Sequence, residues 1–235
     1  LPQGARGTRA AFTLAEVLIT LGVIGVVAAM TLPMLAENYQ RRVVETRLKK
    51  FYTTFNQAIL RSVDVNGPYE WWSYNQGGTL NSKATREQLD NLFGYYLRPY
   101  MNIIQTQEIQ FTDGSGVTLY YLGDGSAFHY RPKFPNDIYY YPKSPVRCLK
   151  QPAIDREGVC TFLFWFAPNM ELSSATVYGY RKGLVPYIYN WNGTQENLYS
   201  GTYGCDSNKV GYYCSFLIQY NDWQFPPDYP RKIRY

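Results

Sequence analysis

The sequence has little of what enzymes and metal proteins most often need. It contains a single histidine, His129, and four cysteines that form no CxxC pair. Because structural zinc sites take clustered His and Cys ligands at short spacings, we expect no zinc site. A nucleophile is activated by a base held beside it, and His129 lies in the strand-like stretch SAFHY without a recognisable partner. The sequence therefore favours a protein that is not an enzyme.

Glycine-rich phosphate loops, internal repeats and dense basic patches are also absent, and the net charge is only +5, so nucleic acid is not indicated as a partner. Paired carboxylates can hydrolyse glycosides, but nothing selects a pair among the scattered acids, each of which we assign to a turn. These acids are Asp113, Asp124, Asp137, Asp155 and Glu157. The loops DGSG, GDGS and CDSN offer oxygen ligands without a complete calcium-loop pattern, so calcium remains an open alternative and no other cofactor is expected.

Apolar residues and tyrosine are plentiful. Apolar residues make up 46% of the 235 positions, which is enough for the core of one or two domains. The 24 tyrosines suit half-buried strands. A Tyr-rich platform for a glycan or a protein partner is the alternative interpretation.

The longest apolar run, 17–36, has about 20 residues and is long enough to span a bilayer as a helix. One acid, Glu16, stands at its start, and Arg6 and Arg9 precede it. In a secretory signal the small residues follow the apolar core, whereas here the alanines 10–11 come before it. We therefore expect the run to stay in the protein as an anchor. An acid in such a span is a functional candidate, or else lies in water at the membrane edge.

The stretch AFTLAEVLITLGVIGVVAAMTLP resembles the N-terminus of type IV pilin and type II secretion pseudopilin precursors. The resemblance implies cleavage by a prepilin peptidase between Ala11 and Phe12, and methylation of the new amine. Glu16, Gly25 and Pro33 fall on the family's glutamate, glycine and proline positions. One departure is the residue before the cut, which is usually glycine and here is Ala11.

The resemblance also implies a leader at 1–11 and a partner for Glu16, the N-terminal amine of a neighbouring subunit. A buried acid is tolerated when an opposite charge lies against it. The expected partners are the lipid bilayer, an inner-membrane assembly platform, and copies of the chain or related pilins. The protein would begin in the inner membrane with its head outside the cytoplasm and end in a filament in the periplasm or at the cell surface.

Several functions stay open within this interpretation. A pilus subunit, a secretion pseudopilin and a DNA-uptake pilin share these features. The chain can also be a minor pilin whose head binds a glycan, DNA or a surface. A membrane-anchored enzyme or binding protein that never polymerises is the alternative from another class.

Helical spacing continues beyond the apolar run. Steps of three and four predict one helix from Phe12 to about Ser62, with its membrane part at 12–36 and a kink at Pro33. The apolar stripe of its second half consists of Val44, Leu48, Phe51, Phe55 and Ile59. The head would then be 63–235.

The head is predicted to be α+β, with the long helix packed on an antiparallel sheet. Thr85 and Gln88 form a capping box for a second helix. EIQF, VTLYYL and SAFHY, separated by Asp-Gly turns, predict a meander. CTFLFWFA and CSFLIQY are interpreted as buried strands, VYGYRKGLVPYIYNW as a hairpin turning at Lys182 and Gly183, and RPKFPNDIYYYPKSPVRC as an ordered loop.

An even number of cysteines in an exported chain predicts disulfides. Three pairings are possible, and we favour the two short loops, Cys148–Cys160 and Cys205–Cys214. One feature opposes export. Lysine and arginine are denser at 41–50 than in the leader, and by the positive-inside rule this would place the head in the cytoplasm. The leader pattern and the cysteines favour the outside.

Overall fold

The computed structural model describes residues 13–72, 84–111, 115–132, 134–166 and 183–235. Contacts between residues divide the chain into two compact units, 1–40 and 41–235. The first helix, α1 (Leu14–Asn66), contributes to both units. The predicted boundary at 62/63 follows the end of the helix, whereas the second unit already begins at residue 41. The second half of α1 is therefore part of the folded head.

Helix α1 is longer than predicted at its C-terminal end and is continuous through Pro33. The helix continues through Pro33 because a proline withholds only one backbone hydrogen bond and the helix retains the others, and the kink expected there stays a prediction. The helix stops at Gly67, which has a left-handed φ of 77° that suits glycine after a helix end. The predicted start, Phe12, lies outside the described residues.

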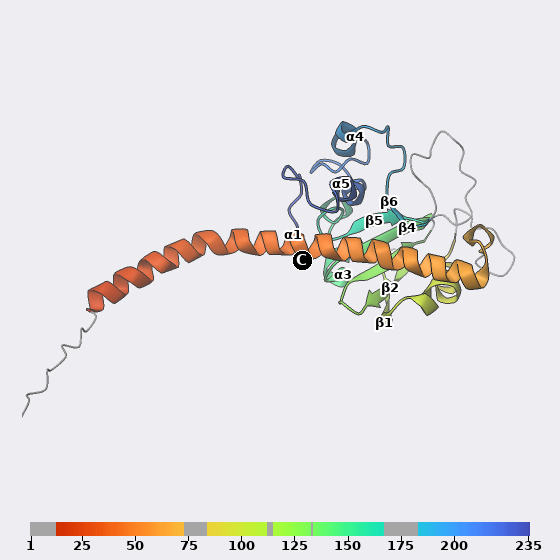
Figure 1. Ribbon diagram of the computed structural model, residues 1–235, viewed down its shortest axis with the longest axis horizontal. Coiled ribbons are helices and arrows are strands. Elements are labelled where there is room, and N and C mark those ends of the chain that lie inside the picture. Colours follow the sequence, from red (N-terminus) through yellow and green to blue (C-terminus); the bar gives the residue numbers. More distant parts are fainter. Residues whose placement is uncertain (1–12, 73–83, 112–114, 133, 167–182) are drawn as a thin grey trace, which may run out of the picture. The chain divides into compact units, whose positions relative to one another are not determined.

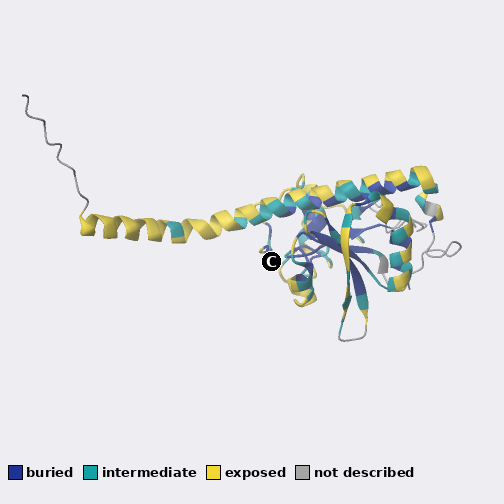
Figure 2. Cartoon of the chain, turned by 90° about the horizontal axis from the view of Figure 1, so that it is seen from below, coloured by how far each residue is buried: buried dark blue, intermediate teal, exposed yellow. Residues whose placement is uncertain are grey.

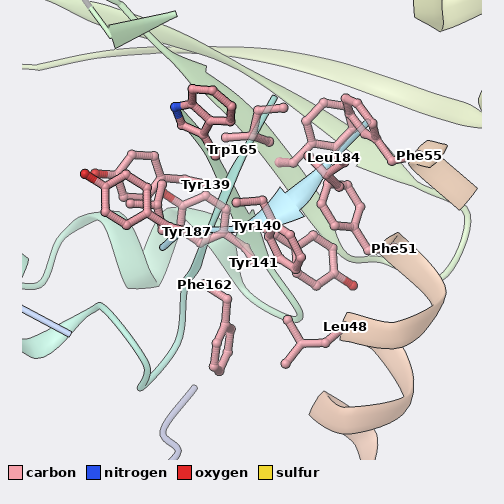
Figure 3. Packing of buried hydrophobic residues seen from close by; sticks show 14 of the residues in the cluster. Leu48, Phe51, Phe55, Tyr139, Tyr140, Tyr141, Phe162, Trp165, Leu184 and Tyr187 are labelled. Carbon is pink, nitrogen blue, oxygen red and sulfur yellow. The ribbon is translucent and has the colours of Figure 1, made fainter. Parts of the chain in front are cut away.

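The predicted apolar stripe on the second half of α1 is confirmed. Its residues are buried together with Ala58 and Ser62. Phe51 stacks on Tyr140 at a ring-centroid distance of 4.2 Å and meets Phe164 edge-on at 5.3 Å. Figure 3 shows Leu48, Phe51 and Phe55 extending from the helix into this aromatic core. Because this helix face packs two phenylalanine rings against the sheet, the helix cannot be separated from the head without opening its core.

Within the described residues the sheet has six strands in the order of the chain, and each strand pairs antiparallel with the next (Figure 1). The α+β class and the meander of the first three strands are thereby confirmed. The strands are β1 (Ile103–Gln110), β2 (Gly116–Leu122), β3 (Ala127–Arg131), β4 (Phe134–Tyr141), β5 (Phe162–Trp165) and β6 (Val185–Pro186).

Shorter helical segments surround the sheet. The predicted capping box is present at α2, where Gln88 N donates to Thr85 Oγ1 and Thr85 N donates to Gln88 Oε1. The α-helices are α2 (Arg86–Leu92), α3 (Pro145–Leu149), α4 (Gln195–Ser200) and α5 (Cys214–Tyr220). The single turns are η1 (Tyr69–Trp71), η2 (Phe93–Leu97), η3 (Arg98–Tyr100) and η4 (Ala153–Asp155).

Alternation along the strands gives the sheet two different faces. Phe128 and Tyr140 contact Phe51 of α1. Their neighbours His129 and Tyr139 stack on each other on the opposite face, which we call the far face. Helix α5 packs beside β5, where the Ser215 hydroxyl donates to the carbonyl of Leu163.

Three predictions of local structure are wrong or only partly testable. The stretch interpreted as a loop contains β4 and α3, because its prolines fall near the ends of these elements and leave NDIYYY free to pair. CSFLIQY is the helix α5 and not a strand. Cys214, Leu217 and Ile218 are spaced by three and four, so a short apolar run fits either structure.

Lys182 of the expected hairpin lies outside the described residues. The described end of that stretch forms β6, which pairs with β5. It also docks on α1, because the Asn56 side chain accepts a bond from Leu184 N at 2.9 Å and donates to Leu184 O at 3.1 Å. A side chain at Gly183 would collide with Asn56, which explains the glycine at this contact.

Candidate functional site

Most residues of the first half of α1 are exposed, as the colouring of Figure 2 shows, and many of them are apolar. Its large apolar residues are between 41% and 77% exposed. They are Leu14, Val17, Leu18, Ile19, Leu21, Val23, Ile24, Val26, Val27, Met30, Leu32, Met34 and Leu35. A helix that is apolar all round belongs in a membrane or among other helices. This helix is long and apolar enough to cross a membrane.

Glu16 closes a capping box at the start of α1. Its Oε2 accepts bonds from Thr13 N at 2.9 Å and Thr13 Oγ1 at 2.8 Å, and Glu16 N donates to Thr13 Oγ1 at 3.2 Å. An acid in the first turn also suits the positive end of the helix dipole. The T-x-x-E spacing in TLAE was a sequence signal for this cap, so Thr13 belongs to the site although it was not predicted. Ala11 and Phe12 lie outside the described residues.

Gly25 and Pro33 lie further along the same helix. From Glu16 they are about 14 Å and 26 Å away at 1.5 Å per residue, so these residues do not form one pocket. An added Cβ at Gly25 or at Gly22 would meet nothing within 4 Å. Bare backbone on an open apolar surface lets another helix approach closely. The arrangement suits lateral packing of helices and not the binding of a small molecule.

Two disulfides stabilise the head. Cys148 pairs with Cys160 and Cys205 with Cys214, at Cα–Cα distances of 5.8 Å and 4.7 Å. This is the pairing of sequence neighbours that we favoured, and it leaves no cysteine of the sequence free. Because disulfides persist in oxidising compartments, the pairs agree with a head outside the cytoplasm.

One arginine forms hydrogen bonds to both disulfide loops, Cys148–Cys160 and Cys205–Cys214. Arg231 is 5% exposed, and its guanidinium donates to carbonyls of both loops. Nη1 donates to the carbonyls of Ile154 and Glu157 at 2.8 Å and 2.9 Å, and Nη2 donates to those of Asp206 and Lys209. No sequence pattern pointed to Arg231, because all four acceptors are backbone carbonyls at least 22 residues away.

Charged and polar groups gather on the far face of the sheet. His129 lies in β3 as predicted, with the rings of Tyr139 and Tyr141 at 5.2 Å and 5.6 Å. Burial, with the nearby positive charges of Arg156 and Arg131, lowers the pKa of His129 to about 3. The imidazole is therefore neutral at ordinary pH.

Two of the acids assigned to turns instead belong to this face. Asp137 lies within β4, with its Oδ2 3.5 Å from Arg131 Nη1, and burial raises the pKa of Asp137 to about 7. Glu157 is 2% exposed, and burial raises its pKa to about 8. Sequence spacing could not reveal this, because the sheet brings together residues from β3, β4 and the first disulfide loop.

In the loops considered for calcium, the carboxylate oxygens of Asp124 and Asp206 already bond to nearby groups of the protein. The Asp124 carboxylate accepts from Ser126 N at 3.1 Å and pairs with Lys50 Nζ at 3.1 Å. Asp206 Oδ1 accepts from Asn208 N at 2.8 Å. Asp113 lies outside the described residues. In the described parts of the chain, no three His, Cys, Asp or Glu side chains are grouped so that they could hold a metal ion.

The first disulfide should contribute measurably to stability. Replacing Cys148 and Cys160 together by alanine opens a loop with a sequence separation of 12. We expect a loss of about 3 kcal/mol in the free energy of unfolding. Thermal unfolding of oxidised protein measures it, and adding a reductant to the unchanged chain should lower its midpoint at least as far, since both disulfides then open. An unchanged midpoint in the double variant would mean that the loop is held by its packing alone.

Comparison with known proteins gives one match. A long apolar N-terminal helix followed by an antiparallel sheet is a pilin-like architecture. No curated protein and no solved structure matches the chain. The profile of a family of unknown function, DUF6613, matches residues 34–233, which include the second half of α1 and nearly all of the head. This chain therefore belongs to the DUF6613 family, whose function is unknown.

Proposed function

We propose that this protein is a structural subunit of a type IV pilus or type II secretion pseudopilus filament, assembled through α1. The observation that carries the proposal is the exposed apolar half of α1 with one acid at its start, followed by a disulfide-bonded head. The proposal assigns no enzymatic activity to the head.

The physical argument concerns what covers the first half of α1. Left in water, its apolar area would cost roughly 25 cal/mol for every Å² exposed. A lipid bilayer covers it before assembly, and a helix is suited to this because it satisfies its backbone hydrogen bonds internally. In a filament, the same helices of neighbouring subunits cover one another. Gly22 and Gly25 would let those helices approach closely.

Glu16 supplies the specific contact in this proposal. Both bonds from Thr13 end on Oε2, and no hydrogen bond to Oε1 is found among the described residues. The carboxylate thus keeps acceptor capacity for another group. After cleavage following Ala11, the methylated amine of Phe12 of a neighbouring subunit would supply the opposite charge.

The proposal names partners and a location. A prepilin peptidase would cleave the leader, and an inner-membrane platform would lift subunits into the filament. The head would lie outside the cytoplasm, in agreement with the two disulfides. Labelling of reduced, intact spheroplasts with a membrane-impermeant thiol reagent tests this orientation. Labelling that requires lysis would place the head inside.

The mature N-terminus provides a direct test of processing. We expect the membrane-extracted protein to begin at Phe12 with a methylated amine, because the small residues precede the apolar run. Mass spectrometry of the N-terminal peptide measures this, and loss of the peptidase should leave the leader attached. A mature start at or beyond Thr31 would indicate ordinary signal cleavage and would remove the anchor on which the proposal depends.

A further inference from the structure

A pocket of about 300 Å³ opens on the far face of the sheet. The strands supply His129, Tyr139 and Tyr141 as its floor. Figure 3 shows Tyr139 on the opposite side of the sheet from the ring of Phe51. The first disulfide loop supplies Arg156 and Glu157 as a wall. We call this cavity the sheet pocket.

Three buried polar atoms of the sheet pocket have no hydrogen-bond partner among the residues that the structure describes. They are Nδ1 of His129, Nε of Arg156 and Oε2 of Glu157. The side chains of His129 and Glu157 are only 5% and 2% exposed. A buried polar atom without a partner is costly, and native proteins contain few of them. Three such atoms around one cavity therefore indicate that a polar molecule completes the site.

The charges indicate which kind of molecule fits. Arg131 at the pocket's edge already pairs with Asp137 at 3.5 Å. Arg156 donates through Nη1 to the Leu149 carbonyl at 3.4 Å, and no ion pair of Arg156 is found in the part of the chain that the structure describes. Glu157, whose pKa burial raises to about 8, is mostly protonated at neutral pH and does not repel an anion. Counting only the described residues, the pocket therefore offers one cation without a counter-charge beside neutral hydrogen-bonding groups.

We propose that the sheet pocket binds a small organic carboxylate, with the carboxylate on Arg156 and a hydroxyl or amino group of the ligand on His129 and Glu157. Arginine suits planar carboxylates because its donors form a fixed fork. The pocket volume lies at the lower end of the range for small-molecule sites, which fits a single sugar acid or amino acid. A sugar acid and an amino acid share the carboxylate and differ in the neighbouring polar group, which is a hydroxyl in the first and an amine in the second.

The first disulfide has a role in this site. Arg156 and Glu157 lie between Cys148 and Cys160, so the covalent loop holds the wall against the sheet. Arg231 also donates hydrogen bonds to the carbonyls of Ile154 and Glu157 in this loop. The site is thus built on rigid supports, which limits the ordering cost of binding.

Calorimetric titration of the full chain in detergent tests the proposal without requiring a filament. The probes are D-galacturonate, L-glutamate and, as the neutral match of the first, D-galactose. We expect one of the two acids to bind with a Kd of about 1 mM or lower for galacturonate, or about 6 mM or lower for glutamate, the affinities that about 13 and about 10 non-hydrogen atoms give at ordinary ligand efficiency. Galactose should bind at least about tenfold more weakly. The better acid identifies the source as sugar acid or amino acid.

Matched variants locate the binding. Arg156→Gln should weaken the acid at least about tenfold. Lys150→Gln makes the same charge change at an exposed position of the same loop and should leave the affinity unchanged. His129→Phe keeps a ring between Tyr139 and Tyr141 and removes Nδ1, so it should weaken binding without lowering the melting temperature. This second variant keeps the test valid should Arg156→Gln fail to fold.

Two results would overturn the proposal. If neither acid binds the unchanged chain, the pocket does not take carboxylates and holds water alone. If Arg156→Gln and His129→Phe bind the acid as well as the parent does, the acid binds elsewhere. Neither result bears on filament assembly, which depends on α1.

Discussion

Replacing Glu16 by alanine is expected to abolish filament formation while the protein stays folded and membrane-anchored. In the proposed filament, the change leaves the neighbour's N-terminal amine buried without its partner. Stranding one member of a buried ion pair costs roughly 3–5 kcal/mol. At about 1.4 kcal/mol per factor of ten, each subunit contact would weaken by roughly a hundredfold or more. Insertion into the membrane should become easier, because an apolar span loses its charge.

The assay expresses each variant as the only copy and compares membrane and sheared fractions by immunoblot. Glu16→Gln should fail nearly as completely, since it keeps the shape and loses the charge. Thr13→Ala is the matched control, because it removes the cap partner of Glu16 and retains the carboxylate. It should cost about 1 kcal/mol of helix stability and still assemble. If both Glu16 variants enter filaments as well as the parent does, Glu16 is only an interfacial side chain. That result would favour the alternative in which the helix serves simply as a membrane anchor.

Replacing Arg231 by methionine should destabilise the head more than any exposed substitution. It leaves four backbone carbonyls of the two disulfide loops without their donor. Unsatisfied buried acceptors cost about 1–3 kcal/mol each, and some of the four will recover a bond to water. We expect a loss of about 3–5 kcal/mol, and a melting temperature lower by roughly 6–20 °C in a unit of this size.

Two further arginine variants serve as controls for this measurement. Arg231→Lys keeps the charge and loses the fork, so it should recover only part of the stability. Arg234→Met removes an exposed arginine from the same segment and should change stability by no more than about 0.5 kcal/mol. Thermal unfolding of the oxidised full chain, followed by tyrosine fluorescence, measures all three. Equal midpoints for Arg231→Met and Arg234→Met would show that the loops hold together without the guanidinium.

Local features could be predicted from the sequence because their causes are local. The stripe from Val44 to Ile59 follows from the helical period, and the capping box at Thr85 from a fixed spacing of three. The Asp-Gly turn at Asp124 predicted the β2–β3 hairpin, and short separations favoured the disulfide pairs found. The prediction of a strand at CSFLIQY was wrong because seven apolar-rich residues satisfy both the helical and the strand period. At such a segment only the tertiary surroundings decide between helix and strand.

The sequence by itself determined the apolar helix and its single acid, predicted the α+β class, and favoured one of three possible pairings of the cysteines. Only the tertiary structure decided that β4 enters the sheet, that Arg231 joins the two disulfide loops, and that His129 and Glu157 face one pocket. The bonds of Arg231 and the pairing of β4 with β5 link residues between 22 and 77 positions apart in the chain. No short-range rule governs them, because the sheet's alternation and the folding back of the C-terminal segment set which side chains meet.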